Sequence, residues 1–412
     1  MIFFIYQIIL IILLLFSPLI IIIRIFKKKE DKIRFKEKFC FFSKIRGEGK
    51  LIWFHGSSVG EIMSVIPIIR KYDENKSFKK ILITSSTLSS AKILEKIKFK
   101  KVIHQFYPID TFFFSNKFLN YWKPDLAIFL ESEIWPSMYK SISSKKIPLI
   151  LLNARITSKT FYRWLKIKKF SKSIFNLINF AFPQNSETNF FLKKLNIKKI
   201  NFIGNLKYVE NKQDNSNKNN VRILKKFKKY KTFIAASTHY SEEILAAKVH
   251  LLLKKVNSKL ITIIIPRHVH RANEIIEDLK NFKLKIIKHS SNNRNLGNVD
   301  IYLVDTFGES KNFYKFATTV FLGGSIVNRG GQNPLEAARY GAKILHGPNV
   351  DNFREIYNHL KSLKISSKAK SPSEFARLIV FKKNMHQVSK IKSKGKTILK
   401  QTLKELDKII KK

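Results

Sequence analysis

The 412-residue sequence has very little cysteine and few acidic side chains. Its one cysteine, Cys40, excludes a disulfide scaffold and a multi-cysteine metal cluster, and it favours a reducing compartment. Only 29 Asp and Glu accompany 79 Lys and Arg, which gives a formal net charge of +50. Hydrophobic residues make up 44% of the chain, enough for two ordinary buried cores, so a wholly disordered protein is also excluded.

The basic excess could indicate binding to nucleic acid, because clustered Lys and Arg displace counterions from phosphate. The lysines, however, recur along the whole chain together with abundant Ile, Phe and Asn, and we find no RNP-like motif, zinc finger or long basic arm. We therefore interpret most of the charge as lysine bias on solvated surfaces and expect no nucleic-acid partner. Attraction to an anionic membrane or to an acidic substrate is the alternative.

Residues 1–23 contain no charged side chain and are mostly Ile, Leu and Phe. Such a helix is long enough to cross a hydrocarbon core of roughly 30 Å. A cleaved signal peptide is the alternative, but it should begin with basic residues and end at small ones, whereas this segment begins MIFFIYQ and continues after Pro18 with bulky Leu19. The dense basic flank from Arg24 predicts a single-pass transmembrane anchor with the rest of the chain in the cytoplasm.

After this segment, short apolar runs alternate with helical patterns, which predicts α/β structure with parallel sheets. The run NKQDNSNKNN, residues 211–220, has no apolar side chain and predicts a linker between two Rossmann-like domains, 24–210 and 221–412. We expect the Lys-rich tail from Ser366 to be helical and to lie on the surface of the second domain. The expected strands are Leu51–Phe54, Lys80–Thr84, Asp125–Leu130, Pro148–Leu152, Thr232–Ala236, Leu260–Ile265, Asp300–Val304 and Thr318–Leu322.

In the first domain, polar residues follow the expected strands. Glu61 lies where a helix opens after a loop of small residues, and Glu131 and Glu133 close a later strand. Because ligands of open α/β sheets bind beyond the carboxyl ends of the strands, these acids are candidate site residues. The alternatives are an acid favoured by the helix dipole at Glu61 and a structural salt bridge at Glu131 or Glu133. Asn153 and Arg155 follow the next strand at the same edge.

The second domain has a comparable set of strand ends. Residues 237–239 (STH), Arg267 and residues 305–309 (DTFGE) each follow an expected strand, and a Gly-rich loop leads to Asn333 and Pro334, the expected N-cap and first residue of a helix. A Gly-rich turn before a helix N-terminus can bind an anion, so these ends predict a pocket for a nucleotide sugar. No histidine spacing typical of zinc and no DxD pair occurs, and we expect metal-independent chemistry.

Taken together, these motifs resemble those of the 3-deoxy-D-manno-octulosonic acid (Kdo) transferases, membrane-anchored bacterial glycosyltransferases with the GT-B fold. The resemblance covers roughly residues 1 to 360. It implies two Rossmann-like domains facing a cleft, with CMP-Kdo as donor and the lipid A precursor (lipid IVA) as acceptor. The strings that carry it are, in order, HGSSVGE, ESEIWP, NARIT, GNLKY, AASTHYSEE, PRH, DTFGE, FLGGS and RGGQNPLEAA.

The resemblance also assigns roles. It places the catalytic base at Glu61, a charge-stabilising acid at Glu131 and a stabilising lysine at Lys207. The family usually has His where this chain has Gln332, and Pro where it has Val269. The implied contacts to CMP are Pro266, Arg267, Phe307, Gly308, Glu309, Asn333, Pro334, Leu335 and Glu336.

The implied setting is the bacterial inner membrane, whose anionic lipids would attract the basic surface, and no cofactor or metal is expected. Two rival functions remain at this point. One is a GT-B enzyme that transfers a sugar from a UDP-sugar to another lipid-linked acceptor. The strings ESEIWP and NPLE favour Kdo transfer over this alternative. The other is a non-enzymatic, membrane-tethered basic protein that binds polyanions, which gives no reason for acids at Glu61 and Glu131.

Overall fold

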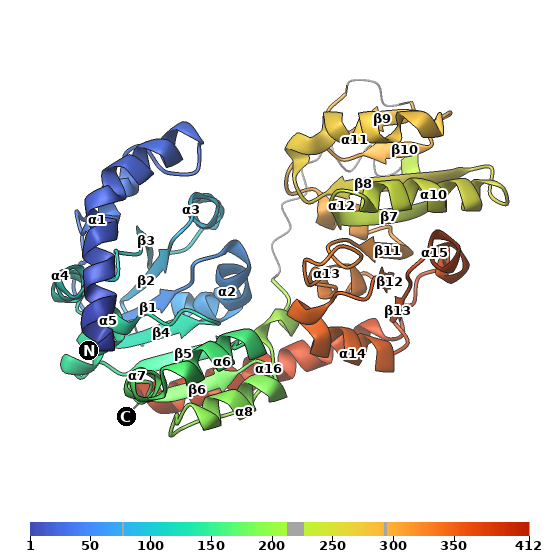
Figure 1. Ribbon diagram of the computed structural model, residues 1–412. Helices are drawn as coiled ribbons and strands as arrows, with labels where there is room; N and C mark the ends of the chain where they lie inside the picture. The colour runs from blue at the N-terminus through green and yellow to red at the C-terminus, as the bar shows by residue number, and fades with distance from the viewer. Residues whose placement is uncertain (76–77, 212–225, 292–294, 412) are drawn as a thin grey trace. The chain divides into compact units, whose positions relative to one another are not determined.

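Two parallel sheets organise the chain. The computed structural model describes residues 1–75, 78–211, 226–291 and 295–411. Residues 1–211 together with 394–412 form unit 1, and residues 212–393 form unit 2. Each unit holds one sheet with helices around it (Figure 1). The predicted α/β class with two Rossmann-like halves is confirmed, whereas the predicted linker, apart from Asn211, lies outside the described residues.

The sheet of unit 1 has six parallel strands in the order β3-β2-β1-β4-β5-β6, which is the Rossmann order. Its strands are rich in Ile, Leu and Phe, and the central ones are buried on both faces, as helix-covered parallel strands must be. The strands are β1 (Leu51–His55), β2 (Lys80–Ser85), β3 (Val102–Phe106), β4 (Leu126–Leu130), β5 (Leu149–Ala154) and β6 (Phe180–Pro183).

The helices of unit 1 mostly begin at side-chain caps, with Ser58, Thr87, Thr111, Thr157 and Asn185 each accepting a backbone N–H of the first turn. They are α1 (Ile2–Phe26), α2 (Val59–Glu74), α3 (Leu88–Glu95), α4 (Phe112–Trp122), α5 (Pro136–Ser144), α6 (Ser158–Lys166), α7 (Lys168–Phe175) and α8 (Ser186–Lys194), with short 3₁₀ turns η1 (Arg34–Phe39) and η2 (Leu206–Tyr208).

The sheet of unit 2 has seven parallel strands in the order β13-β12-β11-β7-β8-β10-β9. Its core is built around Phe233, Phe321 and Phe375, with Ile and Ala side chains between them. The strands are β7 (Lys231–Thr238), β8 (Leu260–Pro266), β9 (Ile286–Lys288), β10 (Ile301–Leu303), β11 (Thr319–Leu322), β12 (Lys343–His346) and β13 (Ser366–Lys368). The helices are α10 (Glu242–Lys254), α11 (Ala272–Leu279), α12 (Ser310–Tyr314), α13 (Leu335–Ala338), α14 (Arg354–Ser362) and α15 (Pro372–Leu378), with 3₁₀ turns η3 (Val269–Arg271), η4 (Lys280–Phe282) and η5 (Asp351–Phe353). The last helix, α16 (Val388–Ile410), begins in unit 2 and continues into unit 1.

The C-terminal tail differs from the prediction in two ways. Residues 366–368 form an edge strand, because their backbone pairs with β12. The long helix α16 does not stay with the second domain, since its residues from Lys394 onward belong to unit 1. There Leu406 is buried, and Asp407 accepts a hydrogen bond from Tyr72 at 3.0 Å.

The apolar N-terminal segment forms helix α1, which is long enough and apolar enough to cross a membrane. Most of its large side chains are exposed, but two polar residues near its start contact the body of unit 1. The hydroxyl of Tyr6 donates to Asp110 at 2.7 Å. Gln7 donates to Ser137 at 2.7 Å and accepts from the backbone of Phe112 at 3.0 Å. In Figure 1, the start of α1 lies beside α4 and α5.

Candidate active site

The candidate residues of unit 1 lie at the point where the strand order of its sheet reverses. Strands β1 and β4 are neighbours there, and the chain leaves them in opposite directions along the sheet (Figure 1). Ligands of such sheets bind beyond the carboxyl ends of these two strands. Glu61 is in the first turn of α2 after β1, and Glu131 follows β4 directly.

The carboxylate of Glu61 is part of a capping box at the start of α2. It accepts hydrogen bonds from the backbone N–H of Ser57 at 2.7 Å and the hydroxyl of Ser58 at 2.8 Å, while Ser58 accepts from the backbone of Glu61. Burial, together with the charges of Glu133 and Glu131, raises the pKa of Glu61 from 4.5 to about 7, against the lowering effect of these hydrogen bonds. The carboxylate therefore exchanges its proton near neutral pH.

Gly56 lets the loop pass closely beneath this acid. A Cβ at this position would lie 2.9 Å from Leu130 and 3.2 Å from the Cβ of Glu61, which is closer than packed carbons approach. A larger residue would push the start of α2 away from β4. The glycine thus fixes the spacing between the Glu61 turn and the end of β4.

Glu131 is held in a polar pocket after β4. Its backbone has a left-handed φ of 49°, and its buried carboxylate contacts Lys207 Nζ at 2.6 Å. Asn153, also left-handed and buried, donates to Glu131 at 3.4 Å and accepts from the backbone of Leu206 at 2.9 Å. Asn205 accepts from the backbone of Lys207 at 2.8 Å. Three segments therefore fix the Lys207–Glu131 ion pair.

The candidate residues of unit 2 lie at the carboxyl edge of its sheet. Arg267 follows β8, and its backbone donates to the Thr238 carbonyl at the end of β7 at 2.9 Å. Burial, followed by the positive charges of His268, Arg329 and Arg267, lowers the pKa of His239. Among the described residues none hydrogen-bonds the solvent-shielded Nε2 of His239. We call Arg267, Arg329, His239 and His268 the Arg–His cluster; its two guanidinium groups suit an anionic group.

The other two predicted segments also follow strands of this sheet. Phe307 is 80% exposed, Gly308 has a left-handed φ of 89°, and Glu309 accepts from the side chain of Asn312 at 2.8 Å at the start of α12. Helix α12 packs against α13, the helix that begins after Pro334. Leu335 is a core residue, and the nearby charge of Glu336 contributes to the raised pKa of buried Tyr314.

The Gly-rich loop after β11 differs from the prediction that it binds an anion of the ligand. Its backbone N–H groups do point toward an anionic group, but that group is the buried carboxylate of Glu242 at the start of α10. Glu242 accepts from Gly324 at 2.7 Å, from Ser325 at 3.1 Å and from Ile326 at 3.0 Å, so these donors are occupied. The helix after Asn333 spans only Leu335–Ala338 with Pro334 as its N-cap, one residue later than predicted, and Asn333 accepts from the backbone of Leu335 at 3.1 Å.

The structure thus brings Glu61, Glu131 and Lys207 together and places the predicted nucleotide contacts along one sheet edge. Within the described ranges, no group of three or more His, Cys, Asp or Glu could hold a metal ion. Sequence reasoning missed Arg329 and the structural role of Glu242. Both lie in recognisable motifs, RGGQNPLEAA and AASTHYSEE, but neither has a spacing that indicates a role.

Comparison with known proteins gives a consistent result. Residues 33–210 match the family model described as 3-deoxy-D-manno-octulosonic-acid transferase (kdotransferase). The transferase of that name from Rickettsia bellii is 33% identical over 362 residues, 88% of this chain and 86% of the relative. The transferase of Haemophilus influenzae is 29% identical, covering 75% and 73%.

Solved structures with the GT-B-like arrangement of two Rossmann-like sheets support the fold alone. The UDP-N-acetylglucosamine 2-epimerase of Rickettsia bellii has a TM-score of 0.52 at 13% identity, covering 88% of this chain and 98% of that one. HepE of Anabaena, solved with UDP and glucose, has a TM-score of 0.55 at 10% identity, covering 87% and 100%. The length and identity of the sequence matches show that this chain is a glycosyltransferase of the 3-deoxy-D-manno-octulosonic acid transferase family.

Proposed function

We propose that the enzyme transfers Kdo from CMP-Kdo to the lipid A precursor, lipid IVA, with inversion at the anomeric carbon and without a metal ion. The observation that carries the proposal is the position of Glu61, an acid whose pKa is raised to about 7, close to the Lys207–Glu131 ion pair at the carboxyl ends of β1 and β4. A general base is most effective when its pKa lies near the working pH.

In the proposed reaction, Glu61 accepts the proton of an acceptor hydroxyl as that oxygen attacks the anomeric carbon of Kdo. The bond from that carbon to the phosphate oxygen of CMP breaks, and the bonding electrons leave with CMP. Positive charge develops on the sugar and is stabilised by the ionised Glu131. The negative charge that develops on the acceptor and donor oxygens is stabilised by Lys207.

The donor would be held by unit 2. Its phosphate suits Arg267 and the rest of the Arg–His cluster, where the shielded Nε2 of His239 is a candidate donor. The permanent positive charges of Arg267 and Arg329 would neutralise the leaving phosphate, which supports a metal-free step. The remaining proposed contacts to CMP are Pro266, at the end of β8, and residues of the segments 307–309 and 333–336: Phe307, Gly308, Glu309, Asn333, Pro334, Leu335 and Glu336.

For localisation, we propose that α1 holds the body on the cytoplasmic face of the bacterial inner membrane, with Lys27, Lys28 and Lys29 near anionic headgroups. A single-pass helix would carry Tyr6 and Gln7 to the far side of the bilayer. Their hydrogen bonds to Asp110, Ser137 and Phe112 would then have to break. These contacts favour a helix that lies in the membrane surface beside unit 1, in place of the spanning helix that the sequence predicts.

The test uses the purified full chain with CMP-Kdo and lipid IVA, followed by mass spectrometry of the lipid. We expect Kdo addition that persists in chelator and that a UDP-sugar does not replace. Glu61→Gln keeps the capping box but cannot accept a proton, so its rate should fall by about 100-fold or more. Glu74→Gln, an exposed acid at the end of the same helix, is the matched control and should keep the parental rate. A Glu61→Gln enzyme within threefold of the parent would contradict the assignment of the base.

A further inference from the structure

Glu133, two residues after Glu131, has an unusually complete set of hydrogen-bond donors. Its Oε2 accepts from Ser57 Oγ at 2.6 Å, Trp135 Nε1 at 2.8 Å and His55 Nε2 at 3.1 Å. Burial alone would raise the pKa of Glu133, but the hydrogen bond and charge of His55 and the other two donors outweigh burial and lower it. Glu133 is therefore a fixed negative charge.

A buried network behind Glu133 orients its histidine partner. His55 is fully buried and stacks on Tyr107 at 3.8 Å between ring centroids. The Thr84 hydroxyl accepts from Trp53 Nε1 at 2.8 Å and lies 2.9 Å from Nδ1 of His55. The ionised carboxylate of Glu133 can only accept, so Nε2 of His55 carries a proton. That N–H points at Glu133 and donates to it.

Ser57 connects Glu133 to Glu61. Its hydroxyl donates to Glu133, and its backbone N–H donates to Glu61 Oε2 at 2.7 Å. The remaining partner of the Ser57 hydroxyl, Ser86 at 3.1 Å, is uncharged. The two carboxylates thus share one residue as donor, and that residue cannot move without disturbing both.

Two neighbouring carboxylates raise the pKa of Glu61, Glu133 with the larger effect and Glu131 with the smaller. Lys207 contacts Glu131 at 2.6 Å. The hydroxyl and backbone groups of Ser57 and Ser58 complete the contacts of Glu61. Glu133 is consequently the main charged group whose removal would change the proton affinity of Glu61.

We propose that Glu133 is a positioning residue for the base: held by His55, Trp135 and Ser57, its permanent charge sets the pH range in which Glu61 works, and Ser57 aligns the two. The proposal rests on the proposed function, in which Glu61 takes the acceptor's proton. A stronger base accepts that proton more readily, at the cost of being partly protonated near neutral pH.

The test is the pH dependence of kcat/KM for the full chain on CMP-Kdo and lipid IVA. In Glu133→Gln the acidic limb, where activity falls as Glu61 gains a proton, should move to lower pH by about one unit. The plateau rate should also fall by roughly 3- to 10-fold, because the base is weaker. A lower plateau with an unmoved acidic limb would mean that Glu133 only supports the fold, and would overturn the proposal.

Two further variants separate the possible causes. Trp135→Phe removes one donor but leaves the charge of Glu133, so its acidic limb should stay in place; a limb that moves as far as in Glu133→Gln would count against the charge as the cause. If Glu133→Gln does not fold, the test uses Glu133→Asp, which keeps the negative charge and should leave the acidic limb of the pH profile in place. An acidic limb that moves to lower pH in Glu133→Asp would overturn the proposal. Failure of the base assignment is distinct, because Glu61→Gln would then keep its rate whatever the behaviour of Glu133.

Discussion

At Glu61, two influences act in opposite directions on one carboxyl group. The capping-box hydrogen bonds from Ser57 and Ser58 favour the ionised form, whereas burial and the charges of Glu133 and Glu131 favour the neutral form. A helix-start acid and a catalytic base are the two alternatives that the sequence indicates at Glu61. The geometry makes Glu61 a helix-start acid without removing its suitability as a base, because the same hydrogen bonds that cap α2 hold the carboxylate in place.

A stability prediction follows from the raised pKa of Glu61. Between its ordinary pKa of 4.5 and about 7 the folded protein holds a proton that the unfolded chain has lost, so the free energy of unfolding falls as pH rises through this range. Glu61→Gln has no carboxyl group at this position, so its free energy of unfolding does not show this decrease with rising pH. Its melting temperature should therefore exceed that of the parent at pH 8, by an amount equivalent to about 1–3 kcal/mol, and the difference should shrink toward pH 4.5.

The measurement is thermal unfolding of both proteins over pH 4.5–8, with Glu74→Gln as the control that should follow the parent. A Glu61→Gln protein that is less stable than the parent at pH 8 would show that the ionised carboxylate is a net stabilising group. In that case the hydrogen bonds of the capping box outweigh burial and charge.

At the scale of single residues, the sequence could indicate chemistry but not pairing. The sequence indicates that Glu131 is an acid that needs a partner, with a structural ion pair as the alternative to a catalytic role. Its partner Lys207 comes from a distant turn, held by Asn153 and Asn205 through hydrogen bonds that no sequence spacing reveals. The occupation of the Gly-rich loop by Glu242 was equally hidden, because it depends on a close approach of α10 to the end of β11.

At the scale of elements, the predictable strands were those with a continuous apolar run. All eight predicted strands exist, and none of their ends is displaced by more than two residues. The missed strands are short or carry polar residues, such as β3 with His104 and Gln105, and β13, whose sequence is SSK. Such strands form because a neighbouring strand offers backbone partners, which is information that local periodicity does not contain.

Gly395 is the element-scale feature with the sharpest consequence. It lies in α16, where a Cβ would approach the carbonyl oxygen of Tyr208 to 2.2 Å. That carbonyl belongs to η2, the turn that carries Lys207. An ordinary Gly→Ala change in a helix stabilises it by about 1 kcal/mol. Here we expect Gly395→Ala to destabilise unit 1 by about 1–3 kcal/mol and to lower kcat, because η2 must shift.

The matched control is Lys396→Ala, an exposed neighbour on the same helix, which should leave the melting temperature nearly unchanged. Melting temperature and kcat are measured for both variants. A melting temperature of Gly395→Ala above that of the parent would show that residue 395 lies farther from the Tyr208 carbonyl than the structure indicates. It would also remove the reason to connect the C-terminal helix with the position of Lys207.

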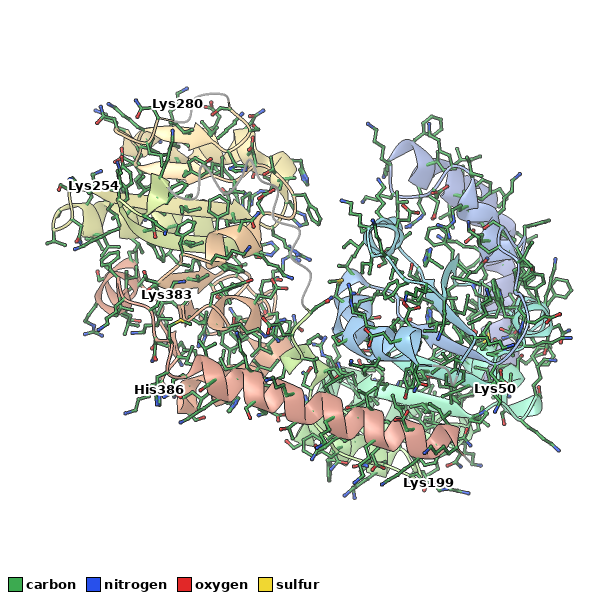
Figure 2. All side chains as sticks on the ribbon, turned by 180° about the vertical axis from the view of Figure 1, so that it is seen from behind. Lys50, Lys199, Lys254, Lys280, Lys383 and His386 are labelled. Carbon is green, nitrogen blue, oxygen red and sulfur yellow. The ribbon has the colours of Figure 1, made fainter. Side chains whose placement is uncertain are left out.

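At the scale of the whole molecule, the +50 charge is spread over both units. Figure 2 shows Lys50 and Lys199 on the outside of unit 1 and Lys280 on the outside of unit 2. This arrangement agrees with lysine bias on solvated surfaces. The basic flank after α1 differs, because Lys27, Lys28 and Lys29 follow directly on an exposed apolar helix. That combination is typical of a segment that binds a membrane surface.

The position of α1 in the membrane gives the last prediction. About 37 Å long, at 1.5 Å per residue, the helix can either cross the bilayer or lie in its surface. Cys40 is buried, so an exposed cysteine introduced by Phe4→Cys is a selective probe of the helix start. Because Tyr6 and Gln7 bind the body, we expect a membrane-impermeant maleimide to label this cysteine only after the cells are opened. Ile45→Cys, exposed on the body, is the control for the cytoplasmic side, and the parent chain measures the background from Cys40. Labelling of Phe4→Cys in intact spheroplasts, with Ile45→Cys protected, would establish a spanning helix and require the contacts of Tyr6 and Gln7 to break in the membrane.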